Sequence, residues 1–251
     1  MSKSKRILSI LTVACLLCVA YLWFFGVATM LALEARYVAW KMPIVKTIPT
    51  ELPDQSIAQA SGQKLNYFGY EFEVPWEIDE AKSKQVGQMR LVAFRSGNSL
   101  LVSRMAPKEF VKDFLSTGKA DPAGLRNLYG EEVLQSDYLL KQRIFEVTPE
   151  KVGLLTPRKE AVGGAMLLLI KGIMMPSGAE SGIYQIRAGD FRGFQFGDPR
   201  SRPKSIDLEI YNQDGGLGFI FTQRQNTSDP AITQAQINRI VQALRKLPNQ
   251  D

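Results

Sequence analysis

The N-terminal part of the chain carries a long stretch without a charged side chain. After Lys3, Lys5 and Arg6, the sequence runs from Ile7 to Leu33 with no Asp, Glu, Lys or Arg. As a helix with about 1.5 Å of rise per residue, this run would reach about 40 Å, whereas the hydrocarbon core of a bilayer is about 30 Å thick. The sequence therefore predicts a membrane-spanning helix.

Two features bear on the fate and orientation of this helix. A cleaved signal peptide has an apolar region of about 7 to 15 residues, and the run before the candidate cleavage site Gly26-Val27-Ala28 is longer than that. Basic residues flank both ends of the run, and the short, densely basic N-terminal tip favours its own retention in the cytoplasm. We predict an uncleaved single-pass anchor over residues 1–33, with residues 34–251 on the periplasmic or extracellular side and cleavage as the alternative.

Aromatic side chains mark the predicted anchor and its outer end. We expect residues 7–33 to contact the lipid bilayer, with Trp23, Phe24 and Phe25 inside it. Tyr37 and Trp40 follow the run, where Tyr and Trp rings prefer to lie among lipid headgroups. Packing in a turn close to the membrane would explain these two rings equally well.

The histidine and cysteine content limits the chemistry of the chain. The sequence has no histidine, and its two cysteines, Cys15 and Cys18, lie inside the apolar run. Because histidine titrates near neutral pH and is the commonest ligand of transition metals, Ser-His-Asp catalysis, Cys-His catalysis and histidine-based zinc or haem sites are excluded for this chain acting alone. We predict no catalytic residue, no metal and no cofactor. The net charge of +6 gives no reason to expect a nucleic acid partner.

A segment containing several prolines separates the anchor from the rest of the chain. Pro43, Pro49 and Pro53 lie within residues 34–64, which show little periodicity. Proline stiffens a connector and cannot donate a ladder hydrogen bond. We predict a stalk over residues 34–64 and a folded domain over residues 65–251.

Strand patterns occur at both ends of this domain. Near its start, apolar residues alternate with polar ones at Phe68, Tyr70, Phe72 and Val74. The turn Ser96-Gly97-Asn98 separates two further strands, which favours a hairpin. After the middle of the domain, glycine-containing turns join four more predicted strands in an antiparallel meander, at residues 183–187, 191–196, 205–211 and 217–222.

Helical patterns occupy the middle of the domain, over about residues 107–175. Ser136 can cap one of these helices. The apolar segment from Ala161 to Met175 is interrupted by Lys171, so it is too short to span a membrane and predicts a buried helix.

The chain ends with an amphipathic helix. Thr233 and Gln236 have the spacing of a capping box, and the residues after them form an apolar stripe at i, i+3, i+4 and i+7, namely Ile237, Ile240, Val241 and Leu244. Strands, helical insertion, strands and a packing helix together predict an α+β fold with a mainly antiparallel sheet of about seven strands.

The meander followed by a final amphipathic helix resembles the sandwich shared by the photosystem PsbP proteins and the nuclear-import factor Mog1. The resemblance covers residues 65–105 and 182–247, and the helical middle would be a large insertion relative to that pattern. It implies a non-catalytic accessory or binding role, although a shared fold does not by itself carry a function.

Two kinds of hydrolase are the catalytic alternatives. Residues two apart on a strand project from one face about 6.6 Å apart, which suits two-carboxylate hydrolysis, and Glu71 with Glu73 and Asp207 with Glu209 have this spacing. The same positions are expected for solvated or paired acids on an alternating strand.

The second catalytic alternative is a Ser-Lys hydrolase. The stretch from Gly197 to Arg202 resembles the Gly-Asp box of membrane-anchored signal peptidases. In those enzymes the nucleophilic serine follows the anchor closely, whereas only Ser56 and Ser61 do so here, inside the predicted stalk.

A basic and aromatic cluster is the candidate interaction surface. It lies in the meander and in the turn that follows its second strand. The basic members could face anionic headgroups or an acidic partner, with a solvated loop as the alternative. The aromatic members would mark a docking patch only if exposed, and otherwise belong to the core. The residues of this predicted surface are Arg187, Arg192, Phe194, Phe196, Arg200, Arg202 and Lys204.

These patterns favour a membrane-anchored, non-catalytic domain that binds another protein on the extracytoplasmic side. The first alternative is a module that binds a small amphiphile between the sheet and the helical middle. That alternative predicts an apolar cavity lined by residues such as Leu167, Leu168, Met174 and Met175. A carboxylate or Ser-Lys hydrolase is the second alternative.

Overall fold

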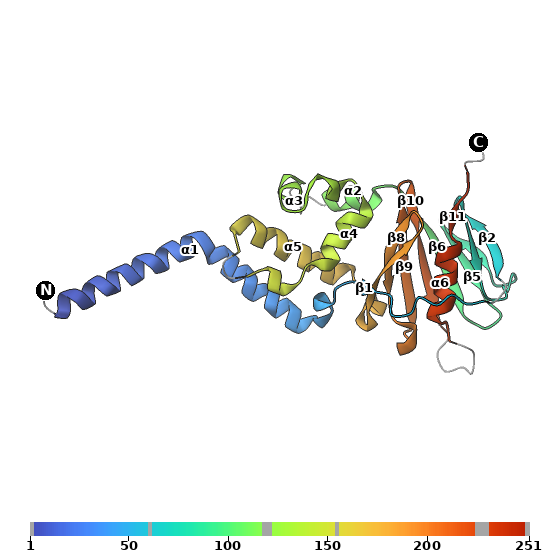
Figure 1. Cartoon of the computed structure of the whole chain (residues 1–251), viewed down its shortest axis with the longest axis horizontal. Coiled ribbons are helices and arrows are strands. Elements are labelled where there is room, and N and C mark those ends of the chain that lie inside the picture. Colours follow the sequence, from blue (N-terminus) through green and yellow to red (C-terminus); the bar gives the residue numbers. More distant parts are fainter. Residues whose placement is uncertain (1–2, 60–61, 117–121, 154–155, 224–230, 249–251) are drawn as a thin grey trace.

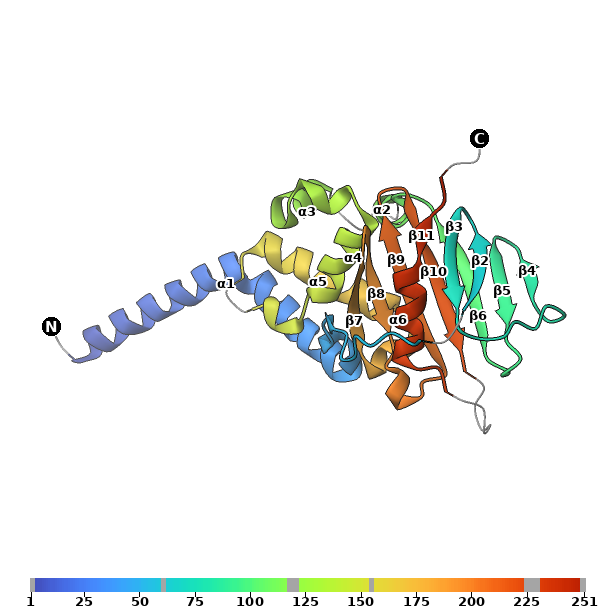
Figure 2. The same cartoon turned by 45° about the vertical axis from the view of Figure 1, so that its right-hand side comes forward.

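The computed structural model describes residues 3–59, 62–116, 122–153, 156–223 and 231–248. A long N-terminal helix leads into a layer of helices, and this layer covers one face of a β-sheet (Figures 1 and 2). A smaller sheet and the C-terminal helix cover the other face. The predicted α+β class is confirmed.

The N-terminal helix α1 extends over Lys3–Lys41. Within the described part of the chain it is the one helix that is long and apolar enough to cross a membrane, judged by length and composition. Because α1 ends at Lys41, the segment 34–64 that was predicted as a stalk begins inside this helix. It continues through the 3-10 turn Pro43–Lys46 and then contributes the short strand β1 (Thr50–Glu51) to the main sheet.

The main sheet has eight strands in the order β1-β7-β8-β9-β10-β6-β5-β4. β1 runs parallel to β7, and the other neighbours are antiparallel. The predicted hairpin of β5 and β6 and the predicted meander of β7 to β10 are both present. Besides β1, the strands are β4 (Lys84–Val86), β5 (Met89–Ala93), β6 (Ser99–Met105), β7 (Ile183–Ala188), β8 (Phe191–Phe196), β9 (Ser205–Asn212) and β10 (Gly215–Thr222).

A second sheet of three strands has the order β11-β3-β2. β2 (Gln63–Tyr67) and β3 (Tyr70–Val74) form a hairpin whose two turn residues, Phe68 and Gly69, have φ values of 58° and 81°. Positive φ at both central residues is the geometry of a tight hairpin turn. The alternating pattern that predicted one strand through Phe68 is therefore broken there. β11 is Arg245–Lys246.

The helical insertion follows β6 and ends before β7, as predicted. Ser136 caps α4, since its hydroxyl accepts a hydrogen bond from the Leu139 N–H. The helices are α2 (Glu109–Ser116), α3 (Pro122–Tyr129), α4 (Asp137–Glu146) and α5 (Arg158–Met174). Between and after them lie the 3-10 turns Glu131–Leu134, Pro149–Lys151 and Ser177–Ser181.

The two faces of the main sheet bury separate cores. On the helical side, Phe194 and Phe196 pack with α4, α5 and the second half of α1. On the α6 side, Leu208 and Phe219 pack with the small sheet and with α6 (Gln234–Ala243). α6 begins with the predicted capping box of Thr233 and Gln236, and its predicted apolar stripe is buried.

Candidate functional site

The predicted basic surface divides into two groups in the structure. Arg187 on β7 and Arg192 on β8 are exposed cross-strand partners beside the β7–β8 turn. Arg200, Arg202 and Lys204 are also exposed, but they follow the opposite end of β8. Six residues of β8 correspond to about 20 Å of strand, so the two groups do not form one patch.

The aromatic members of the predicted surface belong to the core. Phe194 and Phe196 are 0% and 1% exposed. Their rings lie 5.0 and 5.4 Å from the ring of Phe145 on α4, in edge-to-face arrangements. They join the sheet to the helical insertion, which is the core alternative stated for them, and they offer no docking patch.

The turn after β8 is organised by Asp198. Its carboxylate accepts hydrogen bonds from the Arg200 N–H at 2.9 Å and from Arg200 Nη2 at 2.6 Å. The Arg200 side chain holds the pKa of Asp198 below its usual value. The Gly-Asp sequence is therefore explained by a local capping interaction, and no serine nucleophile is needed to account for it.

A groove of about 1130 Å³ crosses the other end of the strands, and we call it the α4–α6 groove. Its walls are the β7–β8 turn, the β9–β10 turn, the beginning of α4 and the end of α6. Alternate turns of an antiparallel meander lie at the same end of a sheet, which brings these two turns together. Side chains along the groove include Tyr138, Phe191, Arg192, Tyr211, Asp214 and Arg245.

Buried charges support the helical wall of this groove. Asp137, at the start of α4, accepts a hydrogen bond from the Val111 N–H at 3.0 Å. Lys141 Nζ lies 2.8 Å from both carboxylate oxygens of Glu209. The hydroxyl of Tyr211 donates to Glu209 at 3.0 Å, and burial together with this carboxylate raises the pKa of Tyr211 well above its usual value. These bonds fix the side chains, so the groove has a preformed shape.

The carboxylate pairs proposed for hydrolysis are separated by their partners. Glu71 pairs with Lys64 at 3.4 Å, and Glu73 pairs with Arg239 at 2.9 Å. Glu209 is held by Lys141, as described above. None of these arrangements leaves two unpaired carboxylates facing one cleft.

Asp207 is the exception among the candidate acids. Its Oδ1 atom is buried and has no hydrogen-bond partner among the described residues. On the sheet it stands between Phe196 on β8 and Ile220 on β10. Burial raises the pKa of Asp207 to about 6, with a smaller contribution from Glu209, although a hydrogen bond from the Ser205 side chain to the carboxylate opposes the shift. Asp207 lines neither the α4–α6 groove nor the smaller cavity described next.

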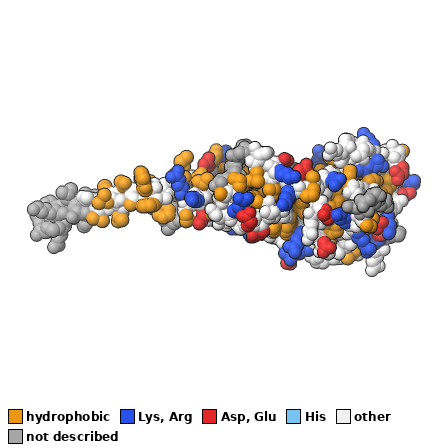
Figure 3. All heavy atoms as spheres, turned by 90° about the horizontal axis from the view of Figure 1, so that it is seen from above, with side chains coloured by type: hydrophobic (Ala, Val, Ile, Leu, Met, Phe, Trp, Pro, Cys, Tyr) orange, Lys and Arg blue, Asp and Glu red, His pale blue; other side chains and the backbone are white. Residues whose placement is uncertain are grey.

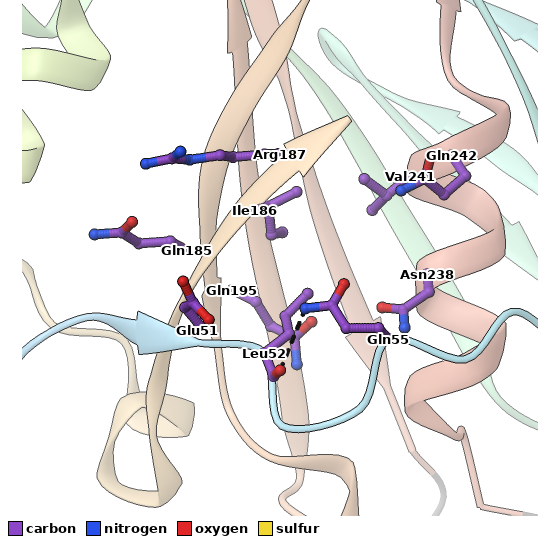
Figure 4. A pocket seen from close by; sticks show the side chains of 10 residues that line it. All are labelled: Glu51, Leu52, Gln55, Gln185, Ile186, Arg187, Gln195, Asn238, Val241 and Gln242. Carbon is purple, nitrogen blue, oxygen red and sulfur yellow. Dashed lines mark hydrogen bonds between the residues drawn. The ribbon is translucent and has the colours of Figure 1, made fainter. Parts of the chain in front are cut away.

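A smaller cavity of about 200 Å³ lies between β7 and α6 (Figure 4). The chain that follows β1 forms one wall and α6 forms another. Polar amide side chains face it, including Gln55, Gln195 and Asn238. Sequence patterns gave no indication of this cavity, because its wall depends on β1, a strand of two residues.

The residues expected to line an amphiphile cavity lie in the helical-side core. Leu167 and Leu168 are 0% and 1% exposed, and Met174 and Met175 are partly buried against the same core. None of the four lines either of the two cavities described above.

The predicted anchor aromatics lie on the outside of α1. Trp23 and Phe24 are exposed, as are Tyr37 and Trp40, whereas Phe25 is partly buried, with its ring centre 5.7 Å from that of Tyr21 in a tilted arrangement. Between its grey tip and the body of the molecule, α1 presents mainly hydrophobic side chains, while basic and acidic side chains are intermixed over the body (Figure 3).

Neither a search for metal-binding groups nor comparison with known proteins assigns a function to the chain. Within the described ranges, no group of three or more Asp, Glu or Cys side chains is placed to hold a metal ion. No protein-family model, curated protein or solved structure matches the chain.

Proposed function

We propose that the chain is a single-pass membrane protein whose extracytoplasmic domain binds an extended segment of a protein partner in the α4–α6 groove. The observation that carries this proposal is the groove itself, preformed across two strand turns and two helix ends. The activity is non-catalytic: the anchor presents the groove at a fixed place above the bilayer.

The groove has a lining that suits a polypeptide segment. Small-molecule pockets are lined predominantly by apolar side chains, whereas this groove carries charged side chains of both signs along its length. The rings of Tyr138, Phe191 and Tyr211 form its floor, but they are only 6%, 8% and 6% exposed, so the accessible contacts are the polar side chains at its border. Asp190, Arg192 and other charged side chains at its border would set the register of a partner segment.

The length and composition of α1 support the anchor. Thr12 to Ala20 are exposed on all sides of the helix, although most of their side chains are apolar. Such a surface is stable in lipid and costly in water. The basic tip before it supports the extracytoplasmic placement of the domain.

Site-specific photocrosslinking of the full-length protein in intact membranes tests the groove. A photoreactive residue at Gln213, which is exposed and lines the groove, should give one discrete crosslinked product. The substitution Arg192→Glu should reduce that product at least about tenfold if charges at this border set the register. As the matched control, the photoreactive residue is placed instead at Gln85, on the exposed edge strand β4, where it should give no such product.

Two results would overturn the groove assignment. One is equal crosslinking from Gln213 and Gln85, and the other is a product from Gln213 that Arg192→Glu leaves unchanged. The control charge change Lys84→Glu, on exposed β4, should have no effect on crosslinking from Gln213.

Thiol accessibility tests the placement of the domain. In a variant with Cys15→Ala and Cys18→Ala, a single cysteine at the exposed position Thr222 should react with a membrane-impermeant maleimide in intact cells whose outer barrier has been opened. Reaction only after the cytoplasmic membrane is disrupted would place the domain on the other side.

A further inference from the structure

The two halves of α1 have different surroundings. The side chains from Thr12 to Ala20 are all exposed. Further along, Ala28, Ala32, Ala35 and Ala39 are 0%, 0%, 3% and 2% exposed. Their spacing of four, three and four residues places them on one face of the helix, and this face packs against the core that contains α5.

The opposite face of the second half is apolar and exposed. Met30, Leu33, Tyr37 and Trp40 are 69%, 59%, 59% and 68% exposed. At about 100° per residue they fall on the face opposite the alanine stripe. Charged residues stand at its flanks, at Glu34, Arg36 and Lys41.

α1 bends at the place where it reaches α5 (Figures 1 and 2). Two features of the preceding turns favour a bend. Gly26 lowers the stiffness of the helix, and the hydroxyl of Thr29 donates to the Phe25 carbonyl oxygen at 3.1 Å, a back-bond that tends to bend helices. The second half of α1 is therefore inclined to the projecting half. In both views, α5 lies on one side of this second half and the projecting half lies on the other side.

We infer that the second half of α1 lies on the surface of the bilayer and faces it with Met30, Leu33, Tyr37 and Trp40. This inference rests on the proposed anchor. If the projecting half of α1 is parallel to the membrane normal, the bend brings the second half close to the membrane surface. The side of the second half that is opposite α5 then faces the membrane. That side carries the exposed apolar face.

The chemistry of this face fits lipid headgroups and the adjoining acyl chains. Tyr and Trp favour the membrane interface because each combines an apolar ring with a polar atom. The Lys41 ammonium lies 4.3 Å from the ring centre of Trp40 and 5.9 Å from that of Tyr37, so a cation accompanies both rings. Basic residues beside an apolar helical face are typical of helices that lie in the interface.

Continuity with the anchor identifies lipid as the occupant of this face. The face belongs to the same unbroken helix as the predicted span, and it begins within a few residues of the bend. A surface helix at this position would fix the tilt of the whole domain, because α5 and the helical layer are packed onto its other side. The α4–α6 groove would then have a defined orientation as well as a defined height.

Depth measurements along α1 test this inference. The full-length protein, with Cys15→Ala and Cys18→Ala, is placed in nanodiscs of equal parts phosphatidylcholine and phosphatidylglycerol. An environment-sensitive probe is attached to one cysteine at a time at positions 30, 33, 37 and 40, and its depth is measured with lipids that carry a quencher at a known position. All four side chains are exposed, so labelling should not disturb the fold.

The expected pattern is four similar depths. A helix on the surface holds positions 30 and 40 within about 5 Å of the same depth, whereas an upright helix would separate them by about 15 Å. Probes at Glu34 and Arg36, on the flanks of the face, are the matched controls and should be quenched less by the lipid reagents and more by a water-soluble one.

Each other outcome has a definite meaning. A steady loss of depth from position 30 to position 40 would overturn the surface orientation while leaving the anchor in place. If the probes are protected from the water-soluble quencher only in nanodiscs that hold two copies of the protein, and the lipid quenchers have no effect, the face would be assigned to a second copy of the chain. Probes at Val13 and Leu16 report on the span itself, and water access there would contradict the anchor rather than the surface helix alone.

Discussion

The two faces of the main sheet bury different kinds of polar side chain. On the α6 side the buried polar groups are neutral amides, represented by Gln195, Gln234 and Asn238. On the helical side they are charged, represented by Asp137, Lys141 and Lys171. An amide needs only hydrogen bonds when it is buried, whereas a charge also loses its hydration. The comparison teaches that the stability contributed by the buried polar side chains should depend on pH on the helical side and not on the α6 side, where the charged pair of Glu73 and Arg239 is only partly buried.

The amides of the α6 side form a closed network. Gln195 and Gln234 exchange hydrogen bonds at 2.7 and 2.9 Å, and Gln234 also donates to Asn238 at 2.9 Å. Asn238 in turn donates to the carbonyl oxygens of Asp54 and Ser56. The segment after β1 is thereby attached to α6, which explains why it lies against the domain.

The charges of the helical side are satisfied at helix ends and by one ion pair. Lys171 Nζ donates to the carbonyl oxygens of Phe145 and Val147 at 2.7 and 2.8 Å, at the end of α4. These carbonyls have no partner within their own helix. The buried lysine therefore acts as a cap for α4 that is supplied by α5.

The largest expected effect comes from removing this cap. Lys171→Ala leaves two buried carbonyls without a donor and opens a cavity, so we expect the free energy of unfolding to fall by about 3 kcal/mol. Urea unfolding in detergent micelles measures this loss. Lys159→Ala, at an exposed position on the same helix, is the matched control and should change stability by less than about 0.5 kcal/mol.

The same lysine should give the protein an unusual alkaline response. Burial lowers the pKa of Lys171 from 10.5 to about 8. Between these values the unfolded chain holds a proton that the folded chain has released, so stability should rise with pH from about 8 toward 9.5. A neutral amine keeps two N–H donors for its two carbonyls. A flat or falling profile over this range, or an equal rise in Lys171→Met, would contradict the assignment.

The next effect tests the ion pair of the helical side. Lys141→Met removes the partner of Glu209, whose side chain is 27% exposed. We expect a loss of about 2 kcal/mol, less than for a fully buried pair because water still reaches the carboxylate. The double substitution Lys141→Met with Glu209→Gln removes the unpaired charge and should recover part of that loss. Additive losses in a double-mutant cycle would show that the two side chains do not interact.

The α6 side could be predicted from the sequence more fully than the helical side. The capping box at Thr233 and the apolar stripe that follows it are local signals, and both correctly placed α6. Lys171, in contrast, interrupted an apolar segment and gave no sign that it would be buried, because its partners lie about 25 residues away, at the C-terminal end of α4. Local patterns report local hydrogen bonds, and a cap supplied by another helix leaves no such pattern.

The candidate site shows the same limit. The turns that border the α4–α6 groove were predicted from their glycines, and the meander implied that they share one end of the sheet. The basic cluster was predicted as one surface because its members lie on neighbouring strands and in the turn that follows, but most of a strand separates Arg192 from Arg200. Proximity along an extended strand is a poor guide to proximity in space, since each residue adds about 3.3 Å.

A smaller effect is expected on the α6 side. Gln234→Ala removes a hydrogen-bond partner from both Gln195 and Asn238, so we expect a loss of about 1.5 kcal/mol. Because all three side chains are uncharged, this loss should be the same at pH 5 and pH 8. Urea unfolding at the two pH values measures it, and a loss that changes with pH would break the contrast between the two faces.

The smallest effect is a gain in stability on the helical side. Asp207 has a buried oxygen without a partner, and burial raises its pKa from 3.8 to about 6. The folded chain then holds a proton between these values that the unfolded chain has lost, so the wild-type protein should lose stability as pH rises from about 4 to 6. Asp207→Asn keeps this site neutral and should be about 1 kcal/mol more stable than the wild type at pH 7, with little difference at pH 4. A variant that is destabilised equally at both pH values would show that the hydrogen bond from Ser205 to the carboxylate stabilises the fold more than burial of the unpaired oxygen costs, and the cost assigned to that burial would be wrong.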